Sequence, residues 1–401
     1  MKISIIKRNC MLIIGVFVIS CTSNEEFFLN KTNDKELSTS VEDNYIVFLK
    51  ETPSSNSRKS NISYLVKQDL MKKDANNFAI EYKISKLKVN QVYGGIFNGF
   101  SIQISDKQKL DQIRNDPRIL RMIKDEVVTL ESHSVNKVEA SSSSQSIPWG
   151  IKRVNGGVSY NGNNVAYILD SGIDLDHPDL NVNESMGFNS FHDTRNGSSL
   201  NDEYGHGTHV AGTIGAIDNA IGVVGVAAGA TVIPVKVLDY SGSGTLSTLF
   251  AGIDFVAANG KPGDVANLSL GLPVEFPPLD EAVEFAASHS GVKFFLSAGN
   301  YSWDASYVSP ARANGTNIYT ISASDINDNF ALFSNYGAPV DWCAPGVNIY
   351  STYLGGGYAY SNGTSMAAPH AAGVYLFGDT PLVSSTVNGD PDGNSDPIIS
   401  R

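Results

Sequence analysis

The fold of this chain is decided by residues 165–172, which read VAYILDSG. Five apolar residues in a row, closed by an acid and a small turn, are typical of a β-strand that is covered on both faces. Similar runs occur at 232–237, 265–270, 292–296 and 318–322, and helical stretches at 245–259 and 279–289 lie between them. This alternation predicts an α/β fold with a largely parallel sheet.

Three polar motifs interrupt this apolar pattern. Asp170 ends the first strand, and the carboxyl ends of strands face the crevice in which α/β sheets bind ligands. The motif GHGTHVAG at 205–212 sets His206 at the mouth of a helix of small residues. The motif GTSMAAPH at 363–370 sets Ser365 at a helix N-terminus, where the helix dipole favours developing negative charge.

Each motif also has a plainer interpretation. Asp-Ser-Gly is a common turn, and a serine before a helix is commonly an N-cap. His206 and His209 are three apart and could indicate a metal, but no His-Glu-x-x-His pattern follows. A serine hydroxyl, however, becomes nucleophilic only when a base takes its proton and a carboxylate fixes the tautomer of that base. The three motifs together therefore predict a nucleophilic serine.

In this chain order the motifs resemble those of the subtilisin-like serine proteases, over residues 145–377. The resemblance implies a three-layer α/β fold with a mostly parallel central sheet. It implies that Ser365 attacks the scissile carbonyl, that His206 acts as base and then acid, and that Asp170 orients His206. It also makes Asn300 the oxyanion donor, together with the Ser365 backbone N–H. The implied activity is that of a serine endopeptidase acting on proteins and peptides.

The same resemblance implies where a substrate would bind. Two backbone segments would add hydrogen bonds to an extended peptide, and they contain Ser243, Gly244, Leu268, Ser269 and Gly271. Val308 matches a wall of the primary specificity pocket in the proteinase K branch. We therefore expect an apolar pocket, since no acidic residue is evident as a floor for lysine or arginine.

Calcium is the ligand that the resemblance implies, in a structural role. The matching ligands are the side chains of Gln145, Asp179 and Asn219 and the carbonyls of Ile217, Ile221 and Val223. Six oxygens suit Ca²⁺, although the loop could also fold without metal. Asp341, with the carbonyls of Thr316 and Ile318, is a second candidate site.

The last residues contain acids at calcium-loop spacing. The segment 388–396 reads NGDPDGNSD, but it lacks the closing glutamate of such a loop. We therefore expect residues 379–401 to form a solvated acidic tail.

The N-terminus predicts export. Lys2, Lys7 and Arg8 precede a short apolar run within residues 1–20, as in a signal peptide. The run ends in VISC, which resembles a bacterial lipobox and makes Cys21 the predicted lipidation site. An ordinary signal peptide that happens to contain a cysteine is the alternative. We expect a protein outside the cytoplasm, anchored by lipid to an outer membrane or cell surface, or else secreted.

A second domain lies between the signal and the catalytic region. After a linker at 21–40, residues 41–131 predict strand, helix, two strands, helix and strand, the ferredoxin-like α+β order. The resemblance implies a propeptide that inhibits its own protease. Residues 132–144 form a processing linker with serines at 141–144, where we expect the zymogen to cut itself. The catalytic domain would then span 145–378.

Composition limits the remaining possibilities. The 401 residues include 29 basic and 41 acidic side chains, and a hydrophobic content of 42% excludes a fibrous or disordered chain. Residues 144–401 hold only 8 of the basic and 24 of the acidic side chains, so nucleic acid is not an expected partner. Three cysteines are too few for a disulfide framework, and Cys343 fits core packing. We expect a monomeric protease; the rival is a catalytically silent, surface-binding lipoprotein of the same fold.

Overall fold

The computed structural model describes residues 40–50, 63–130, 135–138, 144–191, 199–378 and 380–401. The export signal, Cys21 and most of the serine linker lie outside these ranges, so the structure does not bear on the predictions made for them. Within the described ranges, no helix is both long enough and apolar enough to cross a membrane.

The first domain is a four-stranded antiparallel sheet with two helices. Its strands are β1 (Ser40–Leu49), β2 (Val89–Tyr93), β3 (Gly99–Gln103) and β4 (Ile119–Thr129), in the spatial order β4-β1-β3-β2. The helices α2 (Tyr64–Glu81) and α3 (Lys107–Arg114) bury Met71 and Ile113 in one core with Phe100 of β3. A short turn, η2 (Lys86–Lys88), precedes β2. The predicted ferredoxin-like order is confirmed.

The second domain is built on a long central sheet. Its parallel core consists of β7 (Ala166–Asp170), β11 (Thr231–Lys236), β13 (Val265–Leu268), β14 (Lys293–Ser297), β15 (Ile318–Ser324) and β16 (Val340–Pro345). These strands follow the spatial order β16-β15-β14-β13-β7-β11. Every residue of β7 is buried, as the apolar run at 165–169 predicts. The expected strands and the parallel sheet are confirmed.

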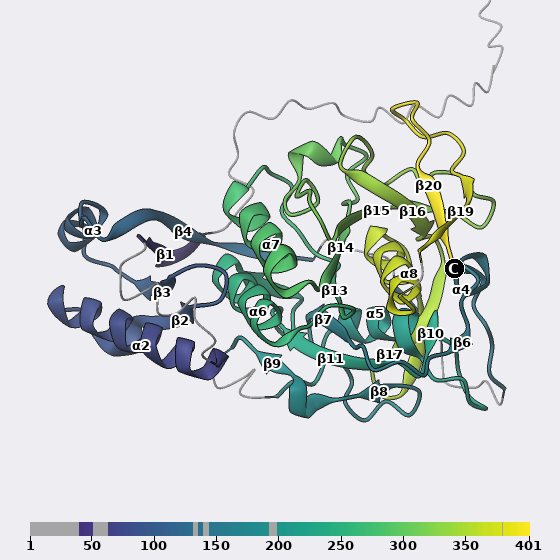
Figure 1. The fold of residues 1–401 in the computed structure, drawn as a ribbon, viewed down its shortest axis with the longest axis horizontal. Helices are drawn as coiled ribbons and strands as arrows, with labels where there is room; N and C mark the ends of the chain where they lie inside the picture. The colour runs from purple at the N-terminus through teal and green to yellow at the C-terminus, as the bar shows by residue number, and fades with distance from the viewer. Residues whose placement is uncertain (1–39, 51–62, 131–134, 139–143, 192–198, 379) are drawn as a thin grey trace, which may run out of the picture. The chain divides into compact units, whose positions relative to one another are not determined.

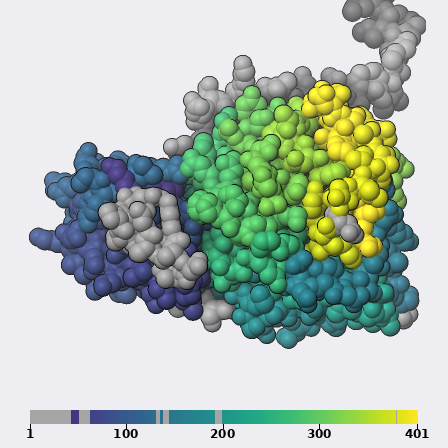
Figure 2. Space-filling view, viewed as in Figure 1, coloured from purple at the N-terminus to yellow at the C-terminus, as the bar shows by residue number. Residues whose placement is uncertain are grey.

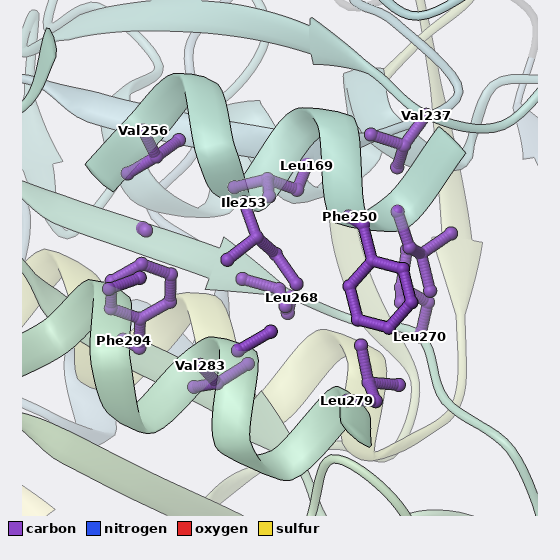
Figure 3. Packing of buried hydrophobic residues seen from close by; sticks show 14 of the residues in the cluster. Leu169, Val237, Phe250, Ile253, Val256, Leu268, Leu270, Leu279, Val283 and Phe294 are labelled. Carbon is purple, nitrogen blue, oxygen red and sulfur yellow. The ribbon is translucent and has the colours of Figure 1, made fainter. Parts of the chain in front are cut away.

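Helices cover both faces of this sheet (Figure 1). On one face, α6 (Leu246–Asn259) and α7 (Pro277–Ser290) pack Phe250 and Val283 against Leu268 and Phe294 of the sheet, as Figure 3 shows. On the other face, α5 (His206–Gly215) and α8 (Thr364–Leu376) belong to a separate buried cluster. Full burial of a side chain of this size contributes about 1.5–3 kcal/mol, so this second cluster holds the two helices that carry the His206 and Ser365 motifs against the sheet.

Short elements complete the domain. They are α4 (Trp149–Arg153), β6 (Val158–Ser159), β8 (Asn181–Val182), η3 (Glu184–Met186), β9 (Phe188–Asn189), β10 (Ala227–Ala228), β12 (Ser243–Thr245), η4 (Ala305–Tyr307), β17 (Ile349–Tyr353) and β18 (Gly357–Ser361). Within the linker, β5 (Val135–Val138) joins β17 and β18 in a three-stranded sheet.

The expectation of a solvated tail is wrong for its last residues, whereas most of residues 388–395 are exposed as expected. Residues after α8 form β19 (Leu382–Thr386) and β20 (Pro397–Ser400), and β20 pairs in parallel with β16, with Ile398 opposite Cys343. Ile398 and Ile399 are fully buried, and Figure 2 shows the last residues (yellow, at the right) packed beside the green part of the domain. The many acids at 388–396 led to the prediction of a polar tail, although a short apolar strand follows them and completes the edge of the sheet. Cys343 is buried beneath it, as predicted, and burial raises the pKa of its thiol to about 12.

Candidate active site

Asp170 and His206 form a buried contact at the carboxyl edge of the sheet. Asp170 is the last residue of β7, and His206 is the first residue of α5. The Nδ1 atom of His206 lies 2.9 and 2.8 Å from the two carboxylate oxygens of Asp170. Both side chains are almost completely buried. A carboxylate on Nδ1 favours the tautomer that carries its proton there and leaves Nε2 able to accept one.

The turn before His206 depends on Gly205. Its φ of 108° lies in the region that glycine tolerates best. A Cβ atom at this position would lie 2.4 Å from the ring of Tyr353. The motif therefore needs glycine here in order to start α5 with His206 facing Asp170.

Ser365 lies at the start of α8, in the same cavity as His206. Its Oγ donates to the Ser269 carbonyl at 3.2 Å, and the Ser269 hydroxyl donates back to the Ser365 carbonyl at 2.8 Å. The cavity is lined by Thr129, Leu130, His206, Ser269, Leu270, Gly271, Ser297, Gly299, Asn300, Val308, Ala311, Asn362 and Ser365. The sequence motifs therefore come together around one hollow.

Asn300 is held in one orientation by Thr364. Its Oδ1 accepts the Thr364 backbone N–H at 2.8 Å and the Thr364 hydroxyl at 3.0 Å. The Thr364 hydroxyl in turn accepts the Gly299 N–H at 3.1 Å. Because the amide oxygen is engaged, the NH₂ group is the part of Asn300 that can donate within the cavity. Sequence reasoning did not single out Thr364.

A match to known families decides the identity. Residues 162–377 match the Subtilase family, and residues 44–131 match the Peptidase inhibitor I9 family. The chain belongs to the subtilase family. It is a subtilisin-like serine protease that carries an I9 propeptide domain, and the family's α/β fold is confirmed.

Named relatives agree with this assignment. The chain is 43% identical over 280 residues to M-protease of Shouchella clausii. The matched region covers 68% of this chain and 67% of that protein. It is 47% identical over 236 residues to Subtilisin Savinase of Lederbergia lenta, covering 57% of this chain and 83% of that protein. A crystal structure of a cold adapted subtilisin-like serine proteinase is similar, with a TM-score of 0.52 and 35% identity, covering 63% of this chain and 96% of that one.

The I9 domain of this subtilase reaches into the cavity. Its strand β4 pairs antiparallel with β12, with Thr129 opposite Ser243 and Val128 opposite Gly244. The Leu130 N–H then donates to the Gly242 carbonyl at 2.9 Å. Of the predicted substrate-binding residues, Ser243 and Gly244 therefore contact an extended strand, and Ser269, Gly271 and Val308 line the cavity. Leu268 does not line it; this residue is buried in β13.

Two buried carboxylates join the I9 domain to helix α6. Asp254 of α6 accepts the N–H groups of Gly95 at 2.6 Å and Ile96 at 2.7 Å, and the Gln68 amide at 2.7 Å. In the other direction, Asp125 accepts the backbone N–H and the hydroxyl of Ser247 in the first turn of α6. Burial raises the pKa of Asp254 to about 6 and also raises the pKa of Asp125. Neither acid was among the residues predicted from the sequence.

A second network that sequence reasoning missed supports Asp170. The Ser171 N–H donates to Asp170 at 2.7 Å, and the Ser171 hydroxyl lies 2.9 Å from the buried Asp202. The Lys236 ammonium, opposite Asp170 in the sheet register, donates to the Ser171 carbonyl. Burial lowers the pKa of Lys236. A lysine inside an otherwise apolar strand was the signal that could have revealed this network.

The residues predicted to bind calcium lie close together. The Gln145 amide nitrogen is 2.7 Å from the Ile217 carbonyl, and 3.3 Å from both the Asn219 Oδ1 and the Val223 carbonyl. Asp179 accepts the Asn219 amide at 2.7 Å. Three oxygens of the predicted set thus converge on one donor, as they would on a cation. Ile221 contacts Asn219 through its N–H.

Other possible metal sites have less support. The carboxylate of Asp341, the second candidate, accepts the Thr320 N–H at 2.8 Å and so holds β15, and burial raises its pKa to about 6. No group of three or more histidine, cysteine or acidic side chains gathers as a metal site within the described residues. The calcium site predicted from the sequence would not appear as such a group, because it has one carboxylate and otherwise neutral amide and carbonyl oxygens.

Proposed function

We propose that this chain is a serine endopeptidase that cuts proteins through an acyl-enzyme on Ser365, and that it is made as a zymogen. The observation that carries the proposal is the buried contact of Asp170 with His206, whose ring lines one cavity with Ser365 and Asn300. The end of the I9 strand β4 lies in that same cavity.

Each of the site residues has its own role in the proposed reaction. His206 Nε2 takes the Ser365 proton while Oγ attacks the scissile carbonyl, and His206 then gives the proton to the leaving amine. Asp170 stabilises the imidazolium. The Asn300 NH₂ group and the Ser365 N–H, at the start of α8, donate hydrogen bonds to the oxyanion. The helix dipole adds to its stabilisation. Water then takes the place of the amine. His206 accepts a proton from the water as it attacks the acyl carbon, and His206 gives that proton to Ser365 Oγ as the acid product leaves.

A fluorophosphonate probe tests this function directly. Such probes phosphonylate only a serine that a neighbouring base activates. We expect the probe to label Ser365 in the wild-type chain once its I9 domain has been cut off and removed, as mass spectrometry of its peptides would show. An unlabelled Ser365 in folded protein would support the rival, a silent surface-binding lipoprotein.

Truncating Asn300 tests the oxyanion site. In Asn300→Ala, we expect kcat to fall about 10²–10³-fold with little change in KM, the cost known for the corresponding donor in subtilisin itself. Steady-state kinetics with a chromogenic peptide measure this. Asn348→Ala, at an exposed position outside the cavity lining, is a matched control. A KM effect alone would mean that Asn300 binds substrate instead.

The zymogen is blocked because its own I9 domain lies where a substrate would. Thr129 and Leu130 line the catalytic cavity, and their strand pairs with the edge that the sequence assigns to substrate. We propose that the chain is cut in the linker 132–144, with Ser141 to Ser144 as the candidate for the mature end before Gln145. Residues 141–143 lie outside the described ranges.

Release of the I9 domain should depend on pH. An exposed aspartate has a pKa near 4, so the value of about 6 for buried Asp254 means that association takes up a proton. Inhibition should be tightest below pH 4 and weaken as pH rises through 6, by up to about 100-fold. Asp125, which also faces this interface, shifts in the same direction, and Tyr64 adjoins Asp254.

The measurement is the inhibition constant of the released I9 domain between pH 4 and 8. Asp254→Asn should flatten the profile, while Glu284→Gln on the exposed face of α7 should leave it unchanged. Tighter inhibition at higher pH would contradict the linkage.

We propose an apolar preference for the residue before the cut bond. Val308, Leu270 and Ala311 are buried or nearly so where they line the cavity, and none of its described lining residues is acidic. Profiling with a peptide library tests this. A preference for arginine or lysine would contradict it.

Calcium would be held by Gln145, Asp179 and Asn219 with the carbonyls of Ile217, Ile221 and Val223. It would link the start of the catalytic domain to the loop 217–223 and so stabilise the fold. At a free calcium concentration of 100 times Kd, this is worth about 2.7 kcal/mol. We expect EDTA to lower Tm by about 5–10 °C, with recovery on adding Ca²⁺. Asp179→Asn should remove most of that difference, whereas Asp218→Asn, exposed in the same loop, should keep it.

We propose that Cys21 carries a lipid that anchors the enzyme to a bacterial outer membrane or cell surface. The support is the lipobox-like sequence before Cys21. Labelling with a radioactive fatty acid should occur in the wild type and be lost in Cys21→Ser. Labelling of neither chain would indicate a secreted enzyme instead.

A further inference from the structure

Two stretches of chain meet at the apolar side of the cavity, which we call the first wall (residues 270–276) and the second wall (residues 308–312). The residues that reach the cavity are Leu270 and Gly271 from the first wall and Val308 and Ala311 from the second. Directly beside them, Leu272 and Ser309 pair antiparallel. The Leu272 N–H donates to the Ser309 carbonyl at 2.7 Å, and the Ser309 N–H donates to the Leu272 carbonyl at 3.2 Å. This backbone pair joins the two walls.

Ser309 also connects the walls to a helix. Its N–H donates to the Val274 carbonyl as well, at 3.1 Å, and its hydroxyl accepts the Phe276 N–H at 2.7 Å. The fully buried Ser309 side chain lies beside that of Asp280, in the first turn of α7, and interacts with it. One residue of the second wall thus contacts the far end of the first wall and the helix that follows it.

Three charged side chains hold the same junction together. The Arg312 guanidinium contacts the Glu275 carboxylate of the first wall, and its Nε lies 3.6 Å from the Asp280 carboxylate of α7. The Arg312 backbone N–H donates to the Val308 carbonyl at 2.9 Å, so a movement of Arg312 is passed to the cavity lining. A guanidinium is planar and presents its donors in fixed directions, so it fixes the relative positions of two carboxylates. We call Glu275, Arg312 and Asp280 the ionic clamp.

We infer that the ionic clamp sets the width of the pocket for the side chain before the cut bond, and so selects among apolar side chains by size. The inference rests on the proposed protease function and names what fixes its specificity. None of the three clamp residues is among the described residues that line the cavity. They are positioning residues, which act through Val308 and Gly271. An extra or missing methylene in an apolar pocket changes kcat/KM by about 10–200-fold, so a small movement of either wall is measurable.

The two carboxylates of the clamp should differ in importance. The Glu275 side chain is 50% exposed, and an ion pair in contact with water contributes little. The Asp280 side chain is only 10% exposed, and a buried carboxylate that loses its cation is left as an uncompensated charge. We therefore expect substitutions of Asp280 or Arg312 to move the walls more than a substitution of Glu275.

Ionisation of Asp280 should make the pocket sensitive to pH. Burial raises the pKa of Asp280 to about 6, against the effects of Ser309 and Arg312, which favour the ionised form. The other charged groups on this side of α7 are Glu275, Glu281 and Glu284, with Arg121 of the attached I9 domain on Glu281. Above pH 6 the Asp280 carboxylate is charged and attracts Arg312. Below pH 6 it takes up a proton, the attraction is lost, and the walls can part.

Three substitutions weaken the clamp to different degrees. Asp280→Asn keeps the shape of the side chain and removes its charge. Arg312→Lys keeps the charge and removes the planar group, and Glu275→Gln changes only the exposed end. Glu184→Gln, at an exposed position in η3, is the matched control. If Asp280→Asn does not fold, the two variants at the partly exposed positions still test the inference.

The test uses the processed enzymes, from which the I9 domain has been removed. Fluorogenic peptides that differ only in the residue before the cut bond, alanine or phenylalanine, report the size of the pocket as the ratio of their kcat/KM values. Protonation of His206 slows the cutting of both peptides alike, so the ratio does not depend on it. A loss of stability would lower the amount of active enzyme, which cancels in the same way.

At pH 8, we expect the phenylalanine-to-alanine ratio to rise at least about 5-fold in Asp280→Asn and Arg312→Lys, because a wider pocket loses contacts mainly with the small side chain. Glu275→Gln should give a smaller rise, and the control none. In the wild type the same ratio should rise as pH falls from 8 to 5, and in Asp280→Asn it should be flat. Unchanged or lower ratios in Asp280→Asn and Arg312→Lys at pH 8, or a flat wild-type profile, would overturn the inference. A wild type that cuts neither peptide would count against the protease function instead.

Discussion

Replacing Ser365 by alanine should lower kcat by about 10⁶-fold, the cost known for the corresponding serine in subtilisin itself. Ser365 is the only one of the three motif residues whose atom would bond to the substrate, so the variant has no acyl-enzyme route. Oxyanion stabilisation and substrate binding would remain, which is why some activity over water should persist. The fold should persist too, because within the described residues the Ser365 hydroxyl donates one hydrogen bond, to the Ser269 carbonyl.

The same variant should keep its I9 domain. If the chain cuts itself, Ser365→Ala stays at full length after signal removal, and gels or intact mass would show it. Ser288→Ala, exposed on α7, should be cut normally. Normal cutting of Ser365→Ala would mean that another protease processes the chain, while retained peptidase activity would mean that Ser365 is not the nucleophile.

The parts of the site that the sequence predicts are those fixed by local structure. Asp170 is predictable because a buried strand must end, and its last residue meets the crevice. His206 and Ser365 are predictable because each opens a helix of small residues. That Asp170, His206 and Ser365 lie near one another follows from the fold class, since a parallel sheet places the carboxyl ends of its strands, and the helices that start there, at one edge.

Other parts depend on contacts between distant segments. Asp254 and Asp125 look like ordinary acids on amphipathic elements, and the groups that donate hydrogen bonds to them come mostly from the other domain. Thr364 acquires its role from Asn300, 64 residues earlier. β5 lies in a polar linker whose composition predicts exposure, yet strand pairing uses the backbone and hardly depends on composition. The tail was mispredicted for a related reason: two isoleucines beside many acids suffice to complete a sheet edge.

Replacing Asp170 by asparagine should lower kcat by about 10⁴-fold with little change in KM, similar to the cost known for this residue type in serine proteases, subtilisin included. The contacts of both Asp170 oxygens with His206 Nδ1 hold the proton on that nitrogen. An amide can donate to Nδ1 instead, which moves the proton to Nε2 and leaves His206 unable to accept from Ser365.

Kinetics and slow fluorophosphonate labelling of Asp170→Asn would measure the effect, with Asp176→Asn, exposed in the next turn, as the control. Since Asp170 acts only through His206, adding Asp170→Asn to Ser365→Ala should cost almost nothing more. A loss of less than 10-fold in the single variant would mean that Asp170 does not set the tautomer, and that the buried network of Ser171, Asp202 and Lys236 orients His206 without it.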